Sequence, residues 1–273
     1  MRISSSTKPN KGRRAQSRTG FLIPRVRGEN LTYRIVEDLG IAVVTGRYSG
    51  NNPFPVEADL CKQYGVSRSI LREAVKMLTA KGLLSARPRQ GTWVQPENAW
   101  NLLDPDVLRW LLERKLSYSL LIEFTQMRLA VEPIAAGLAA HVAAPAEKAA
   151  VMAAIDRMAA AERGEDDPLA SDIAFHVGVM HASGNRFYAQ LTDLIDTALR
   201  FSIRTTNYFK GVKLASVVDH KKVADAILAG DASTAEHGMR IMMQEALDLI
   251  RSAQANAAKA PHSRKQAVDS EFS

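Results

Sequence analysis

The sequence has a single cysteine, Cys61, and no uninterrupted apolar run of the length that crosses a bilayer, about 18 residues. One thiol cannot build a disulfide framework within the chain, which fits a reducing compartment. The N-terminus also lacks the apolar core of a signal peptide. We therefore expect a cytoplasmic protein that does not engage a membrane.

Acidic residues are absent from the first 28 positions. The same stretch carries eight basic side chains: Arg2, Lys8, Lys11, Arg13, Arg14, Arg18, Arg25 and Arg27. Such a segment buries too little apolar surface to order itself, so we expect residues 1–28 to be a disordered basic tail. It could add salt-dependent affinity for DNA phosphates, or it could be a solvated tail without a role. Residues 253–273 are also expected to be disordered.

The 273 residues, 46% of them hydrophobic, are enough for two domains. Apolar spacing and turn residues predict helices over 31–45, 55–64 and 68–81, then short β-like pieces at 83–86 and 92–94. Pro55 suits the start of the second helix, Gly65 the tight turn after it, and Ser67 the cap of the third. This order is typical of a winged helix-turn-helix with a small β-hairpin wing, which we place at residues 29–97.

Behind this head, the pattern is helical from Val107 to Arg251. Breaks are expected at Pro145, Gly164, Gly184, Gly211 and Gly230. We expect a linker over residues 98–116 and an all-α bundle of six or seven helices over residues 117–252. The expected fold class is therefore mainly α, a winged head followed by a helical effector domain.

The third helix has two opposed stripes. The apolar stripe holds Leu71, Ala74, Val75 and Leu78, and the basic stripe holds Arg68, Arg72 and Lys76. A recognition helix places its N-terminal residues in the major groove, where arginine can donate two hydrogen bonds to guanine. We expect Arg68, Ser69 and Arg72 to contact bases, and the turn with Arg89 and Gly91 to approach the DNA backbone. The alternative is a solvated basic face.

Three segments then carry a resemblance: 54–60 (FPVEADL), 65–74 (GVSRSILREA) and 81–84 (KGLL), followed by Gly91-Thr92. They resemble the GntR family of bacterial regulators. This resemblance implies double-stranded operator DNA as a partner, contacted through residues matching Arg68, Ser69, Arg72 and Gly91. One departure is Ala58, which stands where the family often has a basic residue, so that contact would be missing.

Four polar residues of the rear domain occupy positions where the helical pattern expects apolar ones: Arg128, Asp172, His176 and His220. Buried charge is costly unless it is paired, so we expect these groups to converge on one another or on a ligand. An aspartate with two histidines can hold a divalent metal such as zinc, and an inward arginine can clamp a carboxylate. A metal with a carboxylate ligand, a polyhydroxy acid without metal, and a satisfied polar network all remain open.

The rear domain also resembles the FadR-type effector domain of the same family, the FCD domain. The matching pieces are 127–133 (MRLAVEP), 172–176 (DIAFH), 219–220 (DH), 225–227 (DAI) and 229–231 (AGD). Many members bind a metal through one aspartate and three histidines, which would make Asp172, His176 and His220 metal ligands. Met242 stands where the third histidine would fall, and His237 points to another side of the helix. We expect Met242 on the inward stripe, with Met239, Ala246 and Leu249.

The run 100–110 (WNLLDPDVLRW), with Arg128 and Met242, is similar to the galactonate-operon repressors. The resemblance implies a homodimeric repressor that a small carboxylate or sugar acid releases from DNA. We place that effector at Arg128, Asp172, His176 and His220.

Two rival classes are weaker. A metal-dependent enzyme on a small carboxylate, attached to a DNA-binding head, would need a general base beside an activated water. The sequence has no Ser-His-Asp arrangement, no glycine-rich phosphate loop and no cysteine nucleophile to support it. An architectural nucleic-acid binder would not need polar residues inside the rear domain. We therefore expect a regulator and not an enzyme.

Overall fold

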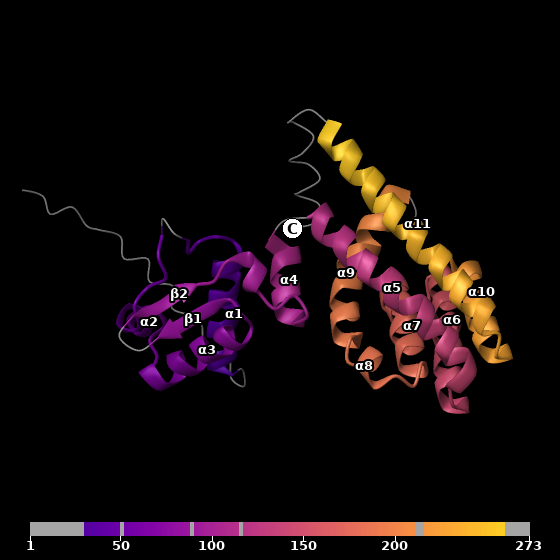
Figure 1. Cartoon of the computed structure of the whole chain (residues 1–273), viewed down its shortest axis with the longest axis horizontal. Coiled ribbons are helices and arrows are strands. Elements are labelled where there is room, and N and C mark those ends of the chain that lie inside the picture. The colour runs from indigo at the N-terminus through magenta and orange to yellow at the C-terminus, as the bar shows by residue number, and fades with distance from the viewer. Residues whose placement is uncertain (1–29, 50–51, 88–89, 115–116, 211–215, 260–273) are drawn as a thin grey trace, which may run out of the picture.

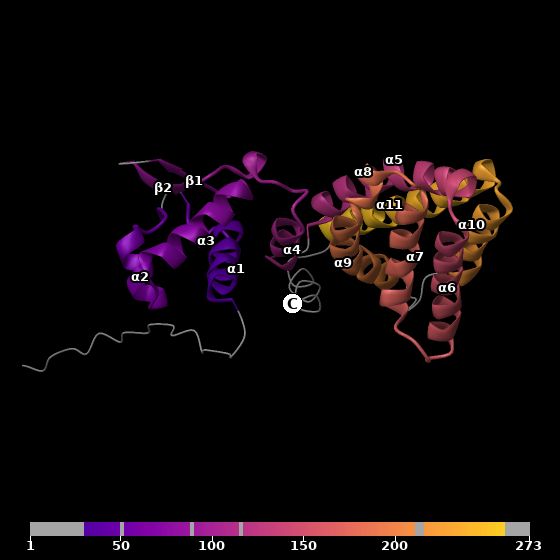
Figure 2. The same cartoon turned by 90° about the horizontal axis from the view of Figure 1, so that it is seen from below.

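The computed structural model describes residues 30–49, 52–87, 90–114, 117–210 and 216–259. They form an N-terminal head (residues 30–100) and a larger helical body (residues 117–259), with the helix α4 between them (Figures 1 and 2). The expected class, mainly α with a two-stranded wing and an all-helical second domain, is confirmed. The basic segment 1–28 lies outside the described residues.

The head contains three helices and a hairpin. These are α1 (Leu31–Val44), α2 (Glu57–Tyr64), α3 (Arg68–Ala80), β1 (Leu84–Arg87) and β2 (Gly91–Val94). The α1 helix starts after Asn30, whose side chain accepts a hydrogen bond from the Thr32 amide at 3.1 Å. The α2 helix ends at Gly65, whose φ of +65° disfavours any residue with a Cβ. The two strands pair antiparallel, with Arg87 opposite Gly91.

The second helix begins at Glu57, two residues later than Pro55 suggested. Val56 is extended, with φ −72° and ψ 152°, so the chain approaches the helix as a strand-like segment. Glu57 and Asp59 then supply the acidic first turn that the helix dipole favours. The apolar faces of the three helices meet in one core that includes Ile35, Leu39, Leu60, Leu71 and Leu78.

The segment 98–116, expected to be a linker, is instead mostly packed structure. It includes part of the short 3-10 helix η1 (Glu97–Ala99) and the whole of α4 (Pro105–Arg114). Pro105 occupies the first position of α4, where a missing N–H costs nothing. The helical pattern expected from Val107 therefore begins two residues earlier, and the segment that connects the two domains is helical over these ten residues.

The α4 helix has two apolar sides. Val107 and Trp110 are buried in the head core, whereas Leu108 and Leu112 are buried in the body core. Accordingly, α4 packs against α1 of the head and α9 of the body. The connection between the two domains is therefore a helix that belongs to both cores.

The described body consists of seven helices, at the upper end of the expected number. They are α5 (Tyr118–Val142), α6 (Pro145–Glu162), α7 (Pro168–Ala182), α8 (Arg186–Ala189), α9 (Thr192–Lys210), α10 (Val217–Ala229) and α11 (Ala232–Lys259). The long helices α5 and α11 lie side by side, and α6, α7 and α9 cross beneath them (Figure 2). Helix ends fall at Pro145, Gly164, Gly184 and Gly230, as predicted, whereas Gly211 lies outside the described residues.

The last helix extends further than expected. We predicted disorder from residue 253, but α11 continues to Lys259. Ile250 and Ala253 are both buried, so this part of α11 still packs on the body. Packing of one apolar stripe therefore extends the helix by seven residues beyond the predicted boundary at 252. Residues 260–273 lie outside the described part of the chain.

Candidate functional site

The exposed face of α3 carries the residues expected to contact bases. The side chains of Arg68 and Arg72 are 73% and 66% exposed, and Ser69 is also exposed. Leu71 and Leu78 on the opposite face are buried in the head core and fix the rotation of the helix. The N-terminal end of α3 is therefore available to enter a major groove.

Glu57 contacts both arginines, and sequence reasoning missed it. Its Oε2 accepts a hydrogen bond from Arg72 Nε at 3.0 Å, and its Oε1 lies 3.8 Å from Arg68 Nε. Exposed ion pairs of this kind add little to stability, at most about 1 kcal/mol. They do restrict the side-chain rotamers, and both contacts use Nε, which leaves the terminal nitrogens for guanine. The sequence shows Glu57 only as an acidic residue at the start of the helix before the turn, which does not indicate a contact with the next helix.

The structure also places the predicted helix cap Ser67 and, except for Arg89, the other positions discussed for DNA contact. Ser67 occupies the cap position of α3, but its hydroxyl lies 2.8 Å from the Ser69 hydroxyl and caps no backbone amide. Gly91 has a φ of +89° and open space around it, so backbone conformation accounts for glycine at this position. Arg89 lies outside the described residues. Ala58 is exposed on α2, where a basic residue would be accessible to DNA.

The body brings the four predicted polar residues together and adds a fifth, Glu132. Arg128 and Glu132 come from α5, Asp172 and His176 from α7, and His220 from α10. All five are buried, with exposures between 0% and 6%. Glu132 lies one helical turn after Arg128, and this i, i+4 spacing was the signal that could have revealed it.

Glu132 joins α5 to α7 through its carboxylate. Its Oε1 accepts a hydrogen bond from Arg128 Nε at 2.5 Å, and its Oε2 accepts from Arg128 Nη2 at 3.2 Å. The same Oε2 lies 2.7 Å from His176 Nδ1. Arg128 is therefore engaged within the protein through two of its nitrogens, and a ligand carboxylate would meet Nη1.

One aspartate oxygen lies close to the ring nitrogens of two histidines, in the group Asp172, His176 and His220. Asp172 Oδ1 lies 3.3 Å from His176 Nε2 and 3.2 Å from His220 Nε2. His220 Nδ1 donates to the Ser216 carbonyl at 2.7 Å, and His176 Nδ1 donates to the Glu132 carboxylate, because both partners can only accept. In the neutral imidazoles, each Nε2 therefore directs a lone pair toward the aspartate oxygen.

This arrangement leaves acceptors facing one another. Among the described residues, Asp172 Oδ1 and His220 Nε2 are buried atoms without a hydrogen-bond partner. A cation would satisfy them together with His176 Nε2, since one ligand atom from each residue lies within 4.8 Å of the others. Tetrahedral zinc with bonds of 2.0–2.2 Å separates its ligand atoms by about 3.3–3.6 Å, close to both measured distances. The three residues therefore fit a divalent metal such as zinc.

The neighbours of the cluster set its charge. Burial raises the pKa of Asp172, but hydrogen bonds and charge from the protonated rings of His176 and His220 lower it further, so the net pKa is well below the ordinary value. Burial also raises the pKa of Glu132, yet the charges of Arg128 and of protonated His176 bring it down to about 2. Both carboxyl groups are thus ionised at neutral pH, as a cation site requires. A cation bound at the two Nε2 atoms would take the place of the ring protons.

Met242 does not lie on the most buried stripe of α11, contrary to the expectation. The buried stripe consists of Ala235, Met239, Met243, Leu247 and Ile250. Met242, Ala246 and Leu249 are half-buried, because after Met239 the buried face continues at Met243 and Leu247, at steps of four residues, and not at Met242. Met242 still packs against the body core, and His237 is exposed.

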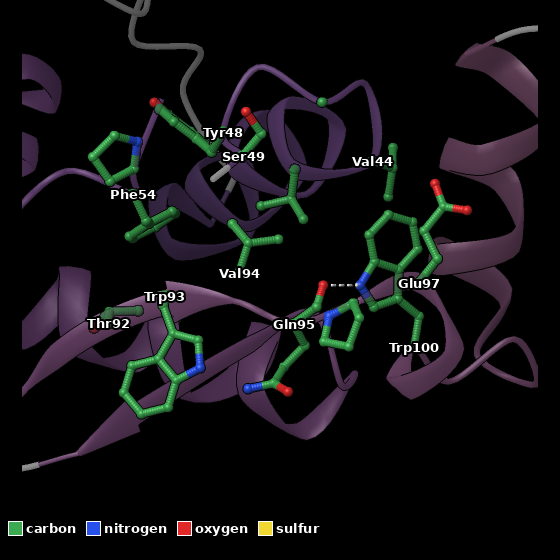
Figure 3. A pocket seen from close by; sticks show the side chains of 14 residues that line it. Val44, Tyr48, Ser49, Phe54, Thr92, Trp93, Val94, Gln95, Glu97 and Trp100 are labelled. Carbon is green, nitrogen blue, oxygen red and sulfur yellow. Dashed lines mark hydrogen bonds between the residues drawn. The ribbon is translucent and has the colours of Figure 1, made fainter. Parts of the chain in front are cut away.

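The head contains a separate groove of about 550 Å³. Figure 3 shows Tyr48, Phe54, Trp93 and Trp100 around it, between the end of α1 and strand β2. Trp100 Nε1 donates to the backbone carbonyl of Gln95 at 3.0 Å and is therefore already satisfied. The described residues that line it include no lysine, arginine or histidine, so they offer no cationic side chain to an anion.

Comparisons with known proteins agree with this division of the chain. The family model for bacterial regulatory proteins of the gntR family matches residues 31–94, and the FCD domain model matches residues 123–245. The chain is 33% identical over 215 residues to the galactonate operon transcriptional repressor of Escherichia coli K12, covering 78% of this chain and 94% of the relative. It is 32% identical over 212 residues to the E. coli K12 HTH-type transcriptional regulator YieP, covering 76% and 90%.

Among solved structures, the fold is similar to that of Lar, which controls the expression of the Listeria monocytogenes agr system. The TM-score is 0.51 at 16% identity, covering 82% of this chain and 98% of that one. None of the described helices is both long and apolar enough to span a membrane.

The identity and coverage of the galactonate operon repressor are high enough to establish the family. Because the matched family and these relatives are transcriptional regulators, the alternative of a metal-dependent enzyme is not supported. This chain belongs to the GntR family of bacterial transcriptional regulators, with a DNA-binding winged head and an FCD domain as its body.

Proposed function

We propose that the protein is a homodimeric repressor that leaves its operator when a small sugar acid binds in the body. The observation that carries this proposal is the buried convergence of Asp172, His176 and His220 beside Arg128. A relative at 33% identity is named for repression of the galactonate operon, which supports a galactonate-like acid as effector. Cytoplasmic location follows from operator binding.

The DNA contacts would come from two heads, one from each protomer. Arg68, Ser69 and Arg72 would contact base edges, while Arg89 and Gly91 of the wing turn would approach the sugar-phosphate backbone. A two-fold dimer would bind two half-sites of a near-palindromic operator, spaced by whole helical turns. The exposed arginines of α3 support this arrangement.

The effector would bind at the charged cluster of the body. Asp172, His176 and His220 would hold a divalent metal such as zinc, which would supply positive charge for the carboxylate and hydroxyl oxygens of the acid. Arg128 would contribute a second positive group through Nη1, because Nε and Nη2 are engaged with Glu132. The buried acceptors without partners support the metal.

A chain of packed helices would connect this site to the head. The α7 helix packs against α9, α9 against α4, and α4 against α1. An effector changes operator affinity only if it prefers one arrangement of these helices, and its preference sets the size of the response. Repositioning of α4 would change the spacing of the two heads.

A mobility-shift assay on the DNA beside the protein's own gene tests the proposal. It would use a panel of sugar acids that includes galactonate, with and without a metal chelator. We expect one acid to release the DNA and the chelator to weaken its effect. His220→Ala should abolish release, whereas His237→Ala, which changes an exposed histidine on α11, should not. If no acid alters operator binding, the effector role of the cluster is wrong.

A further inference from the structure

We propose that Glu132 is a positioning residue that holds His176 in the Nδ1–H tautomer, so that Nε2 is free to bind the metal. The inference rests on the proposed function in so far as a metal is bound, but the tautomer itself can be measured without metal. It assigns a role to a residue outside the three ligand side chains. Glu132 comes from α5, whereas His176 comes from α7.

The geometry gives Glu132 this role. The residue is fully buried, and its Oε2 lies 2.7 Å from His176 Nδ1. An ionised carboxylate accepts hydrogen bonds and donates none, so the Nδ1 atom must carry the proton. The remaining ring nitrogen, Nε2, then faces Asp172 Oδ1 at 3.3 Å with its lone pair. A carboxylate behind a ligand histidine orients the ring and increases its basicity.

The two histidines are held differently. His220 Nδ1 donates to the backbone carbonyl of Ser216, the residue that caps α10, at 2.7 Å. That acceptor is present whatever side chain occupies position 216. His176 depends on a side chain from a different helix, so its orientation can be changed by one substitution in α5.

The competing explanation is that Glu132 only neutralises Arg128. Arg128 Nε meets Oε1 at 2.5 Å and Nη2 meets Oε2 at 3.2 Å, so an ion pair is certainly present. The Oε2 atom nevertheless lies nearer to His176 than to Arg128 Nη2. The two explanations predict different zinc affinities for variants in which the charges of both Arg128 and Glu132 are removed.

Two double variants separate them. Arg128→Met with Glu132→Met removes the ion pair and the acceptor, whereas Arg128→Met with Glu132→Gln removes the ion pair and keeps a neutral carbonyl acceptor. Zinc affinity would be measured on the full-length protein by competition with a chelating dye. We expect the Met/Met variant to bind zinc about 10- to 100-fold more weakly than wild type, the usual effect of losing such a partner. The Met/Gln variant should retain most of the affinity.

Equal zinc affinity in both double variants and in wild type would overturn the positioning role and leave neutralisation as the explanation. An equal loss in both would also overturn it, because the effect would then follow the lost charge and not the hydrogen bond. Thermal unfolding by circular dichroism confirms that each variant is folded before its affinity is compared.

A second measurement requires no substitution and no metal. The ¹⁵N chemical shifts of the histidine rings in metal-free wild type, recorded at alkaline pH, report the tautomer of each of the six histidines. We expect His176 to be protonated at Nδ1 and unprotonated at Nε2. An Nε2–H tautomer would refute the proposal. If wild type binds no zinc, the proposed metal fails, while the ring shifts still decide the role of Glu132.

Discussion

Replacing Arg128 by alanine should destabilise the body strongly, although the residue was first singled out as a ligand contact. Its partner Glu132 is fully buried, and without Arg128 that carboxylate would keep only the contact of its Oε2 with His176 Nδ1. Removing one member of a buried ion pair leaves an uncompensated charge, which costs about 3–5 kcal/mol. In a domain of this size each kcal/mol lowers the unfolding temperature by about 2–4 °C, so we expect a decrease of about 6–20 °C.

Differential scanning calorimetry on the full chain measures this change. The matched control is Arg240→Ala, because Arg240 also forms an i, i+4 pair, with Glu236 at 2.7 Å, but on the surface of α11. Exposed pairs contribute at most about 1 kcal/mol, so the control should shift the unfolding temperature by no more than about 4 °C. Equal, small shifts in the two variants would refute the reasoning.

Three further outcomes follow from the head and from α4. Arg72→Ala should weaken operator binding about 5- to 150-fold in an anisotropy titration, since a bidentate base contact contributes about 1–3 kcal/mol, and normal affinity would remove it from the interface. Gly40→Ala should lower the unfolding temperature, because the new Cβ would clash with the Trp110 ring and overpacking costs about 1–3 kcal/mol. An unchanged unfolding temperature would contradict the close packing of Trp110 on Gly40. The hydrogen bond from Arg109 lowers the pKa of Glu37 below 4.5, so their contact stabilises the head above about pH 4.5 and is lost as pH falls through the lowered pKa. An acid titration followed by tryptophan fluorescence should show this acid sensitivity in wild type and not in Arg109→Ala. Identical titration curves for the two proteins would contradict the role of the Glu37–Arg109 contact.

The head could be predicted closely because local signals agree with one another. Gly65 ends α2 with a positive φ, and the apolar and basic stripes of α3 repeat with the helical period. Each of these features depends on residues within one or two turns of sequence. Glu57 was missed because its partners, Arg68 and Arg72, lie on a different helix, and no local pattern reports a contact across the turn.

In the body, the sequence predicted which residues are polar and buried but not how they pair. Asp172 and His176 share a face of α7, and this follows from their spacing. His220 lies beside them only because the helices α7 and α10 come together in the folded body. The sequence marked His220 as a polar residue on an apolar stripe but did not indicate its partners. The rotation of α11 about its axis could not be predicted from the sequence either, because Met239 fits both the predicted and the observed stripe. Packing against α5 selects the stripe that contains Met243.

The two sides of α4 differ in the kind of contact they make, and this bears on the proposed coupling. On the head side, the ring of Trp110 lies against Gly40, and Arg109 donates two hydrogen bonds of 2.7 Å to Glu37. On the body side, Leu108 and Leu112 join an apolar core. Directional contacts resist sliding, whereas apolar surfaces repack at lower cost. A rearrangement of α9 on effector binding would therefore displace α4 and the head as one unit, so that a small shift in the body becomes a change in the spacing of the two DNA-reading helices.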